Sequence, residues 1–267
     1  MSVPLAFFER TDRGFEPLPA AVGAWSPDMV NGPAICGLLG GELDSAHRPE
    51  GFVPARLTVD LFRATLRKPL EVTTVEVRRG SRIAVADAQL LQEGRAVARA
   101  TAVFLRPSEQ PPGQVWTRGE VPEPPPAELR GDAPVSYLWN SGEDASGWSR
   151  RLGGHQNDQR KRTWQRPFPV ILGEEPNVLA TVATVGESTS MLTNWGQQGV
   201  GYINGDLTLV LSRLPRGGAI GVQAENHFST DGIAVGNATL FDEDGPFGAG
   251  VTTAVANPAA QVDFSQH

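Results

Sequence analysis

The sequence predicts an α+β protein made of two tandem units, each an antiparallel sheet wrapped around a central helix. Residues 56–63 return as residues 206–213, at an offset of 150 residues. Both copies then alternate apolar and polar residues up to an acidic-Gly pair, at 93–94 and at 244–245. Acidic-Gly pairs between alternating runs are typical of tight hairpins. Because solenoid repeats are only about 20 to 50 residues long, this repeat indicates two domains.

The first unit, residues 1–106, begins with a helix predicted over residues 31–43. Asn31 can cap this helix, Pro33 suits its first turn, and Ile35, Leu38 and Leu39 form one apolar face. Cys36 lies among several small residues of the helix, which indicates close packing around a buried thiol. The repeated strand and a hairpin follow, over residues 83–91 and 97–104.

Residues 107–134 contain eight of the 22 prolines and predict a stiff, extended linker. The second unit, residues 135–267, opens with a stretch over 139–167 that is rich in Trp, Arg and Gln and fits neither helix nor strand. Its apolar residues predict a second helix over 178–195. The repeated strand and a hairpin at 244–245 complete this unit.

Composition excludes several classes of function. A net charge of −7 and a pI near 5.2 argue against nucleic acid as a partner, and no run of 18 apolar residues predicts a membrane span. A lone cysteine and an N-terminus unlike a signal peptide favour the reducing cytoplasm. The four histidines stand far apart, so neither a metal nor a cofactor is expected. A homo-oligomer is left open.

Four segments together resemble the acyl-CoA thioesterase II family. They are Asn-Gly-Pro-Ala at 31–34, Leu-Thr-Val-Asp-Leu-Phe-Arg at 57–63, Leu-Thr-Asn-Trp-Gly at 192–196, and Ile-Asn-Gly-Asp-Leu-Thr at 203–208. The resemblance covers nearly the whole chain outside the linker and implies a tandem double hotdog fold. It also implies a hydrolase of lipid metabolism that converts acyl-CoA to free acid and CoA.

The resemblance implies an Asp at the head of the second unit's strand that activates water, helped by a Ser/Thr and a Gln. Asp206 matches the Asp, seven residues before Arg213. The Ser/Thr position falls near His227, so that role is not assigned. The Gln falls on Thr252, or on Thr253 if the strand is displaced by one residue. Loss of one positioned polar group at an active site costs about 10² to 10³ in rate.

Backbone N–H groups at the start of the first helix are candidates to stabilise the negative charge on the carbonyl oxygen. Gly32 and Ala34 can donate, whereas Pro33 has no N–H. An equally good structural interpretation is that these residues only shape a tight helix start.

Three functions are compatible with these residues. The favoured one is an acyl-CoA thioesterase in which Asp206 activates water. The second is an acyl-thioester-binding protein that has lost activity with the Gln. The third is a hydratase or dehydratase on the same fold, which would need Asp206 beside His227.

Overall fold

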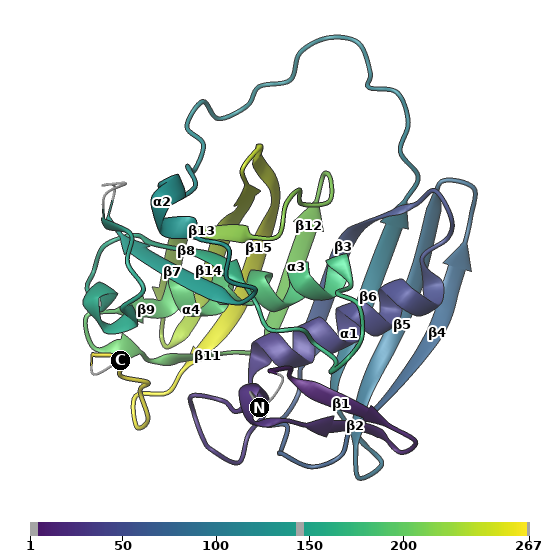
Figure 1. Cartoon of the computed structure of the whole chain (residues 1–267), viewed down its shortest axis with the longest axis horizontal. Helices are drawn as coiled ribbons and strands as arrows, with labels where there is room; N and C mark the ends of the chain where they lie inside the picture. The colour runs from purple at the N-terminus through teal and green to yellow at the C-terminus, as the bar shows by residue number, and fades with distance from the viewer. Residues whose placement is uncertain (1–4, 143–146, 266–267) are drawn as a thin grey trace.

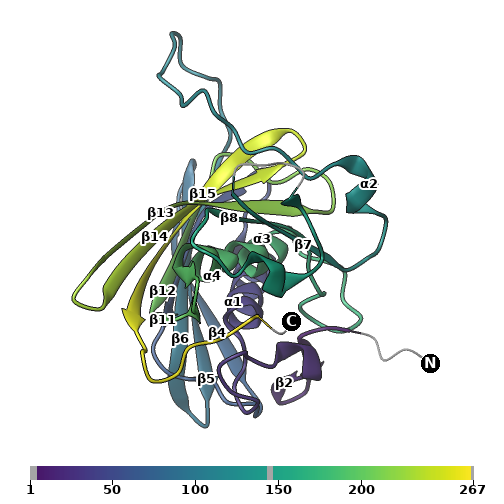
Figure 2. The same cartoon turned by 90° about the vertical axis from the view of Figure 1, so that its left-hand side faces the viewer.

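An 11-stranded antiparallel sheet dominates the computed structural model, which describes residues 5–142 and 147–265 (Figure 1). The strands follow the order β4-β5-β6-β3-β12-β15-β14-β13-β8-β7, and β11 pairs with β15. The sheet curves around the helices on one of its faces (Figure 2), which confirms the predicted α+β architecture.

The strands of the first unit are β3 (Val53–Leu61), β4 (Glu71–Arg79), β5 (Ile83–Gln92) and β6 (Arg95–Leu105). Those of the second are β7 (Ser136–Ser141), β8 (Lys161–Arg166), β11 (Tyr202–Asn204), β12 (Asp206–Leu211), β13 (Ile220–Thr230), β14 (Ile233–Asp242) and β15 (Gly245–Ala256).

Two small ribbons lie outside this sheet. They pair β1 (Phe8–Thr11) with β2 (Gly14–Pro17), and β9 (Trp195–Gly196) with β10 (Gly199–Val200). Both predicted hairpin turns are confirmed, because Glu93, Gly94 and Gly245 adopt φ angles of 50°, 74° and 99°.

Three helices pack on the concave face of the sheet: α1 (Gly32–His47), α3 (Val178–Gly186) and α4 (Ser188–Asn194). Asn31 caps α1 by accepting a hydrogen bond from the Ala34 N–H at 2.8 Å, and Asn177 caps α3 in the same way. The sequence predicts the start of α1 correctly, although the helix runs four residues beyond the predicted end. Shorter helical turns are α2 (Ala127–Arg130), η1 (Pro19–Ala21) and η3 (Leu152–His155).

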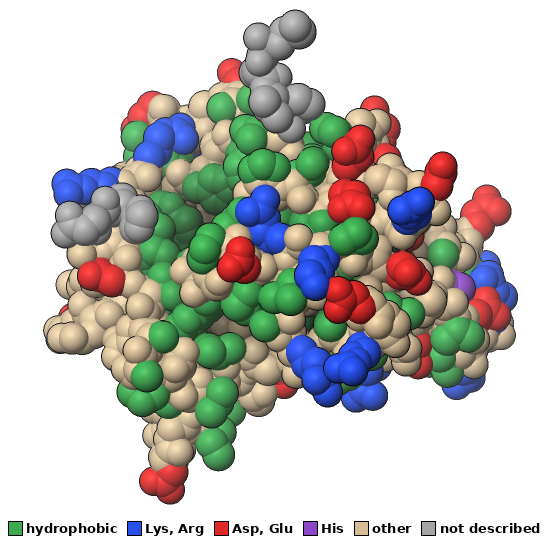
Figure 3. Space-filling view, turned by 90° about the horizontal axis from the view of Figure 1, so that it is seen from below, with side chains coloured by type: hydrophobic (Ala, Val, Ile, Leu, Met, Phe, Trp, Pro, Cys, Tyr) green, Lys and Arg blue, Asp and Glu red, His purple; other side chains and the backbone are tan. Residues whose placement is uncertain are grey.

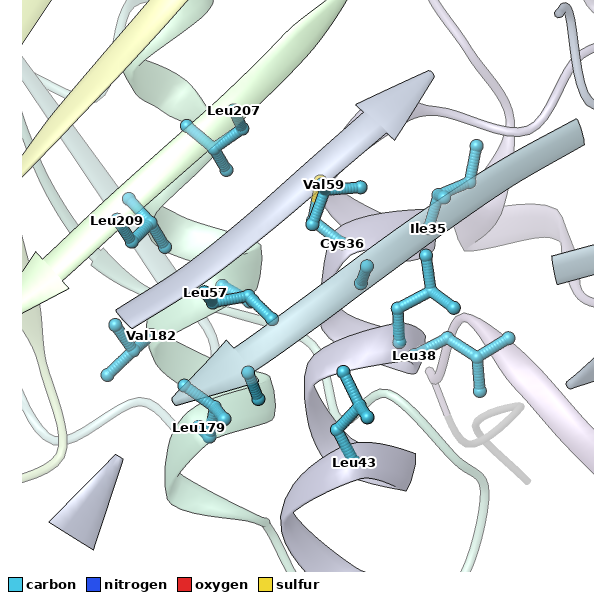
Figure 4. Packing of buried hydrophobic residues seen from close by; sticks show 14 of the residues in the cluster. Ile35, Cys36, Leu38, Leu43, Leu57, Val59, Leu179, Val182, Leu207 and Leu209 are labelled. Carbon is cyan, nitrogen blue, oxygen red and sulfur yellow. The ribbon is translucent and has the colours of Figure 1, made fainter. Parts of the chain in front are cut away.

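The close packing predicted for the first helix is confirmed by its contacts with α3. A Cβ on Gly37 would lie 2.2 Å from Thr184 Oγ1, and one on Gly41 would lie 3.2 Å from Ala180 Cβ. Only glycine at 37 lets the two helices approach this closely. Figure 4 shows their apolar side chains meeting those of the central strands β3 and β12, in one core that joins the two units.

The second helix differs from the prediction, because it is broken into α3 and α4 at Glu187. Gly186, the last residue of α3, lies against Leu209. A Cβ on Gly186 would lie only 2.8 Å from the methyl groups of Leu209. Ser190 N donates to Glu187 O and starts a new turn. The break places Glu187 against Gly32 at the start of α1, where the two units meet.

The Trp- and Arg-rich stretch also differs from the prediction, because it contributes two strands. β7 pairs with β8, and β8 pairs with β13, so the stretch extends the sheet of the second unit. All but the last residue of β8 are buried. Burial on both faces removes the period-2 pattern by which a strand is recognised in sequence.

The predicted linker arches away from the body of the molecule (Figure 1). Over the described residues of the face in Figure 3, acidic and basic side chains are interspersed and do not form a continuous basic surface. That distribution agrees with the acidic composition.

Candidate active site at the junction of the two units

The carboxylate of Asp206 is held by one residue of the neighbouring strand. Its Oδ1 accepts a hydrogen bond from the Thr253 N–H at 2.7 Å, and its Oδ2 accepts one from Thr253 Oγ1 at 2.8 Å. An ionised carboxylate has about four acceptor positions. Two positions therefore remain for water at this half-buried side chain.

Alternation along β12 decides which face of the sheet this carboxylate occupies. Leu207 and Leu209 are fully buried toward the helices, so Asp206 and Thr208 belong to the opposite face. Asp206 pairs there with Asp60 of β3. Asp60 is neutralised by Arg99, whose Nε lies 2.6 Å from Asp60 Oδ2.

The two threonines that the sequence proposes in place of the family Gln have different contacts. The hydroxyl of Thr252 is buried and donates to the main-chain oxygen of Asp206 at 2.8 Å. It does not reach the carboxylate. Thr253, the alternative residue, makes both contacts to the carboxylate. Of the two threonines, Thr253 is therefore the one that contacts the carboxylate of Asp206.

His227 lies apart from the carboxylate of Asp206. Its imidazole packs edge-on against Tyr202, with ring centroids 5.4 Å apart. The ladder pairs His227 with Gly236 and Gly236 with Thr252, so His227 belongs to the helix-facing side of the sheet. The sheet therefore separates His227 from the carboxylate of Asp206, whereas the hydratase alternative needs the two side chains next to each other.

The start of α1 offers one of the two predicted backbone donors. The Ala34 N–H is already bonded to Asn31 Oδ1, and the Ile35 N–H to Asn31 O. Asn31 therefore removes Ala34 from the predicted pair, and Pro33 has no N–H. Gly32 is left as the donor of this first turn.

Glu187, which the sequence patterns did not predict as a site residue, faces this helix start. A Cβ on Gly32 would lie 2.3 Å from Glu187 Oε1, so glycine is what admits the carboxyl group here. Asn204 Nδ2 donates to Glu187 Oε1 at 3.2 Å and contacts the main-chain oxygen of Asp206 at 3.4 Å. Burial raises the pKa of Glu187 to about 7, and the hydrogen bond from Asn204 opposes that shift.

One signal in the sequence could have identified Glu187. It is the only charged residue between positions 178 and 195, in a segment otherwise suited to burial. A carboxyl group in such a position is rarely buried without a function or a partner.

Two grooves border the helices. The larger, of about 680 Å³, is lined by α1, α3 and the segment before α3. Its lining combines apolar residues, among them Leu38, Phe168, Ile171, Val178, Ala180 and Ile220, with charged ones, among them Glu42, Asp44, Arg48 and Arg166. The smaller, of about 420 Å³, contains His227 together with Lys161 and Trp195. The larger groove begins about 9 Å along α1 from Gly32, at the usual rise of about 1.5 Å per residue.

Over residues 5–142 and 147–265, His, Cys, Asp and Glu do not gather in threes in a way that would hold a metal ion. In the same part of the chain, none of the helices is both long and apolar enough to cross a membrane.

Solved structures share this architecture over most of the chain. The tesB protein of Mycobacterium avium subspecies paratuberculosis matches with a TM-score of 0.63 and 17% identity, covering 94% of this chain and 96% of that one. A hot dog fold protein of unknown function from Alicyclobacillus acidocaldarius matches with a TM-score of 0.66 and 18% identity, covering 93% and 94%. The acyl-CoA thioesterase II TesB2 of Mycobacterium marinum matches with a TM-score of 0.60 and 13% identity, covering 84% and 90%. At these identities the likeness shows the fold, a double hotdog.

Family models extend this result from the fold to the family. Residues 21–105 match the acyl-CoA thioesterase N-terminal domain, and residues 119–255 match the acyl-CoA thioesterase C-terminal domain. The chain therefore belongs to the acyl-CoA thioesterase family. A search of curated proteins returned no match.

Proposed function

We propose that this protein hydrolyses an acyl-CoA thioester to the free acid and CoA, and that Asp206 activates the attacking water. The observation that supports this role most directly is the fixed carboxylate of Asp206, held at both oxygens by Thr253. A base must be held within hydrogen-bond reach of the water it deprotonates. Two free acceptor positions on a half-buried carboxylate meet that requirement.

The acyl chain has a suitable place in the larger groove. Its lining includes Leu38 of α1 and Val178 and Ala180 of α3, together with charged residues. A lining that combines apolar side chains with polar groups is typical of small-molecule sites. We place the acyl chain along this groove.

Thiol release tests the proposal. The purified protein is incubated with acyl-CoAs of several chain lengths while free CoA is followed, alongside Asp206→Asn and Asp60→Asn. Asp60 is the matched control, because it is the carboxylate opposite Asp206 on the same face and pairs with Arg99. We expect Asp206→Asn to lose at least 10²-fold in kcat/KM and Asp60→Asn to stay within a factor of about three. Equal hydrolysis by wild type and Asp206→Asn would contradict the role of Asp206.

A non-catalytic acyl-thioester-binding protein is the second candidate. It is favoured by one observation, the presence of threonine at 252 and 253, where the family resemblance implies a Gln. Retention of acyl-CoA without thiol release, by wild type and Asp206→Asn alike, would support it. The hydratase alternative has lost its basis, because His227 contacts Tyr202 and lies across the sheet from the carboxylate of Asp206.

A further inference from the structure

We propose that Arg166 binds a carboxylate at the far end of the acyl group, so that the preferred substrates are CoA thioesters of dicarboxylic acids. This inference rests on the proposed function and names the substrate class of that site. The guanidinium holds the second carboxylate of the substrate by charge-assisted hydrogen bonds. Arg166 takes no part in cleavage of the thioester and acts on specificity alone.

The first support is the position of the guanidinium. Arg166 is the last residue of β8 and lines the larger groove together with Phe168 and Ile220. Gly218, which lines the same groove, locates the charged end of the side chain. A Cβ on Gly218 would lie 3.6 Å from Arg166 Nε and 3.9 Å from its Cζ. The guanidinium itself therefore lies at the groove, and not only the aliphatic part of the side chain.

The second support is that this guanidinium is unpaired. Arg166 is half-buried, and over residues 5–142 and 147–265 its side chain forms neither a hydrogen bond nor an ion pair. The other basic side chains that are withdrawn from solvent at least as far as half-burial all have partners: Arg130, Arg160, Lys161, Arg162 and Arg213. Arginine is rarely withdrawn from water without a partner. Unused donors on a half-buried cation indicate an anionic ligand.

The other arginine of the groove already has its partner. Arg48 Nε lies 3.2 Å from Oδ1 of Asp44, whose side chain is buried. An anionic ligand at Arg48 would have to compete with this ion pair, whereas at Arg166 it meets free donors. Arg166 is therefore the place in the groove where an anionic group of the substrate binds.

The charges of the lining favour a single carboxylate over the phosphates of CoA. Four acidic residues also line the groove: Glu42, Asp44, Glu174 and Glu175. They repel a nucleotide that carries several negative charges more strongly than a group that carries one. One guanidinium matches one carboxylate, which it binds through two parallel hydrogen bonds. The apolar side chains of Phe168 and Ile220 suit the methylene chain that leads to this carboxylate.

Kinetics with matched substrates test the assignment. Adipoyl-, suberoyl- and sebacoyl-CoA are compared with hexanoyl-, octanoyl- and decanoyl-CoA, which have the same chain lengths and end in a methyl group. At each length we measure the ratio of kcat/KM for the carboxylate-ended substrate to kcat/KM for the methyl-ended one. Arg166→Gln removes the charge at the groove. Arg216→Gln is the matched control, because Arg216 lies outside the groove lining and pairs with Asp244.

We expect this ratio to fall by about tenfold or more in Arg166→Gln, because the charge-assisted hydrogen bonds to the carboxylate are lost. Arg216→Gln should keep the wild-type ratio. The same ratio in wild type and Arg166→Gln at every chain length would overturn the proposal. An equal rise in KM for both kinds of substrate would place Arg166 at a phosphate of CoA and would also overturn it.

Two variants of Gly218 test the same contact from the other side of the groove. Gly218→Asp puts a carboxylate beside the guanidinium, whereas Gly218→Asn puts an uncharged amide of the same size there. Both side chains fit, since a Cβ at this position meets Arg166 at an ordinary contact distance. We expect Gly218→Asp to lose the preference for carboxylate-ended substrates and Gly218→Asn to keep it. Equal loss in both variants would show that shape rather than charge sets the preference, contrary to the proposal.

Binding without turnover separates this proposal from the proposed function. The probes are two acyl-CoA analogues in which CH₂ replaces sulfur, one ending in a carboxylate and one in a methyl group, titrated calorimetrically into the intact protein. We expect Arg166→Gln to raise Kd for the carboxylate-ended analogue by about tenfold or more and to leave Kd for the other within about threefold. If this holds while no variant releases CoA from an acyl-CoA, the proposed hydrolysis is wrong and the carboxylate site stands. If wild type hydrolyses acyl-CoAs but Arg166→Gln binds both analogues as wild type does, the carboxylate site is wrong and the hydrolysis stands.

Discussion

Thr58 and Thr208, which occupy equivalent positions of the two repeats, face each other across the central pair of strands with their hydroxyl oxygens 3.2 Å apart. A pair of equivalent residues that meet each other marks a local two-fold axis. The axis passes between β3 and β12, so the duplication seen in the sequence becomes a symmetric junction in the fold.

The same axis defines where the two halves differ in chemistry. It relates Asp206 to Arg56, which pairs with Val210 in the ladder. It also brings Asp60 opposite Asp206. The two ends of the junction therefore carry different polar groups, and the proposed site uses one of them.

The hydroxyl of Thr253 should be needed for activity more than for stability. Thr253→Ala removes the contact to Asp206 Oδ2 but keeps the backbone N–H that binds Oδ1. We expect kcat/KM to fall by about tenfold or more, because one of two groups orienting the carboxylate is lost. Thiol release with purified protein measures it. An unchanged rate would show that the backbone N–H alone fixes the carboxylate.

Thr252→Ala is the matched control for this substitution. The buried hydroxyl of Thr252 donates to the main-chain oxygen of Asp206, so its loss leaves that oxygen only the longer contact from Asn204, at a cost of about 1–3 kcal/mol. We expect a lower free energy of unfolding for Thr252→Ala and an unchanged one for the exposed Thr253→Ala. Denaturant titration distinguishes them.

The sequence predicts the fold well because the fold is specified locally. The Asn31 cap, the repeated strand and the acidic-Gly turns each act within a few residues, and the structure contains all of them. β8 could not be predicted in the same way, since its buried polar residues are satisfied by distant partners. Gln165, for example, is buried and donates to Ser188 Oγ, 23 positions away, at 2.9 Å.

The candidate site could be predicted only in part. Asp206 lies on a segment that the family resemblance covers, whereas the contact between Gly32 and Glu187 joins residues 155 positions apart. Sequence patterns also left Thr252 and Thr253 undecided. A register shift of one residue exchanges the two faces of a strand, and only the ladder fixes that register.

The length of the larger groove should limit the acyl chain. Val178 lines it at the start of α3 and is 42% exposed, so a larger side chain fits there without disturbing the core. We expect Val178→Trp to lower kcat/KM for the longest acyl-CoAs and to leave the shortest unaffected. Val121→Trp, an exposed linker position away from the groove, is the control. Equal loss at every chain length would place the acyl chain elsewhere.

Glu187→Gln should become more stable than the wild type as pH rises, because the substitution removes a buried carboxyl group that would ionise. The pKa of this group is raised from 4.5 to about 7 by burial, so the folded state binds more protons than the unfolded state between these values. The contribution of the Glu187 carboxyl to the free energy of unfolding is therefore largest below pH 4.5, and it is lost as pH rises through 7. Glu187→Gln does not titrate. We expect its advantage over wild type to grow by up to about 3 kcal/mol between pH 4.5 and 7, as measured by denaturant unfolding at each pH.

Gly32→Ala should be harmful only while Glu187 is present. The added Cβ would lie 2.3 Å from Glu187 Oε1, and the buried carboxyl group has little room to move. In the wild-type background we expect a loss of about 1–3 kcal/mol in the free energy of unfolding. In the Glu187→Ala background the clash disappears, and because alanine is a better helix former than glycine the change should be neutral or stabilising. Gly41→Ala, which meets Ala180 Cβ at 3.2 Å, should have the same effect in both backgrounds. Independent effects of Gly32→Ala and Glu187→Ala in this double-mutant cycle would show that the two residues are not in contact.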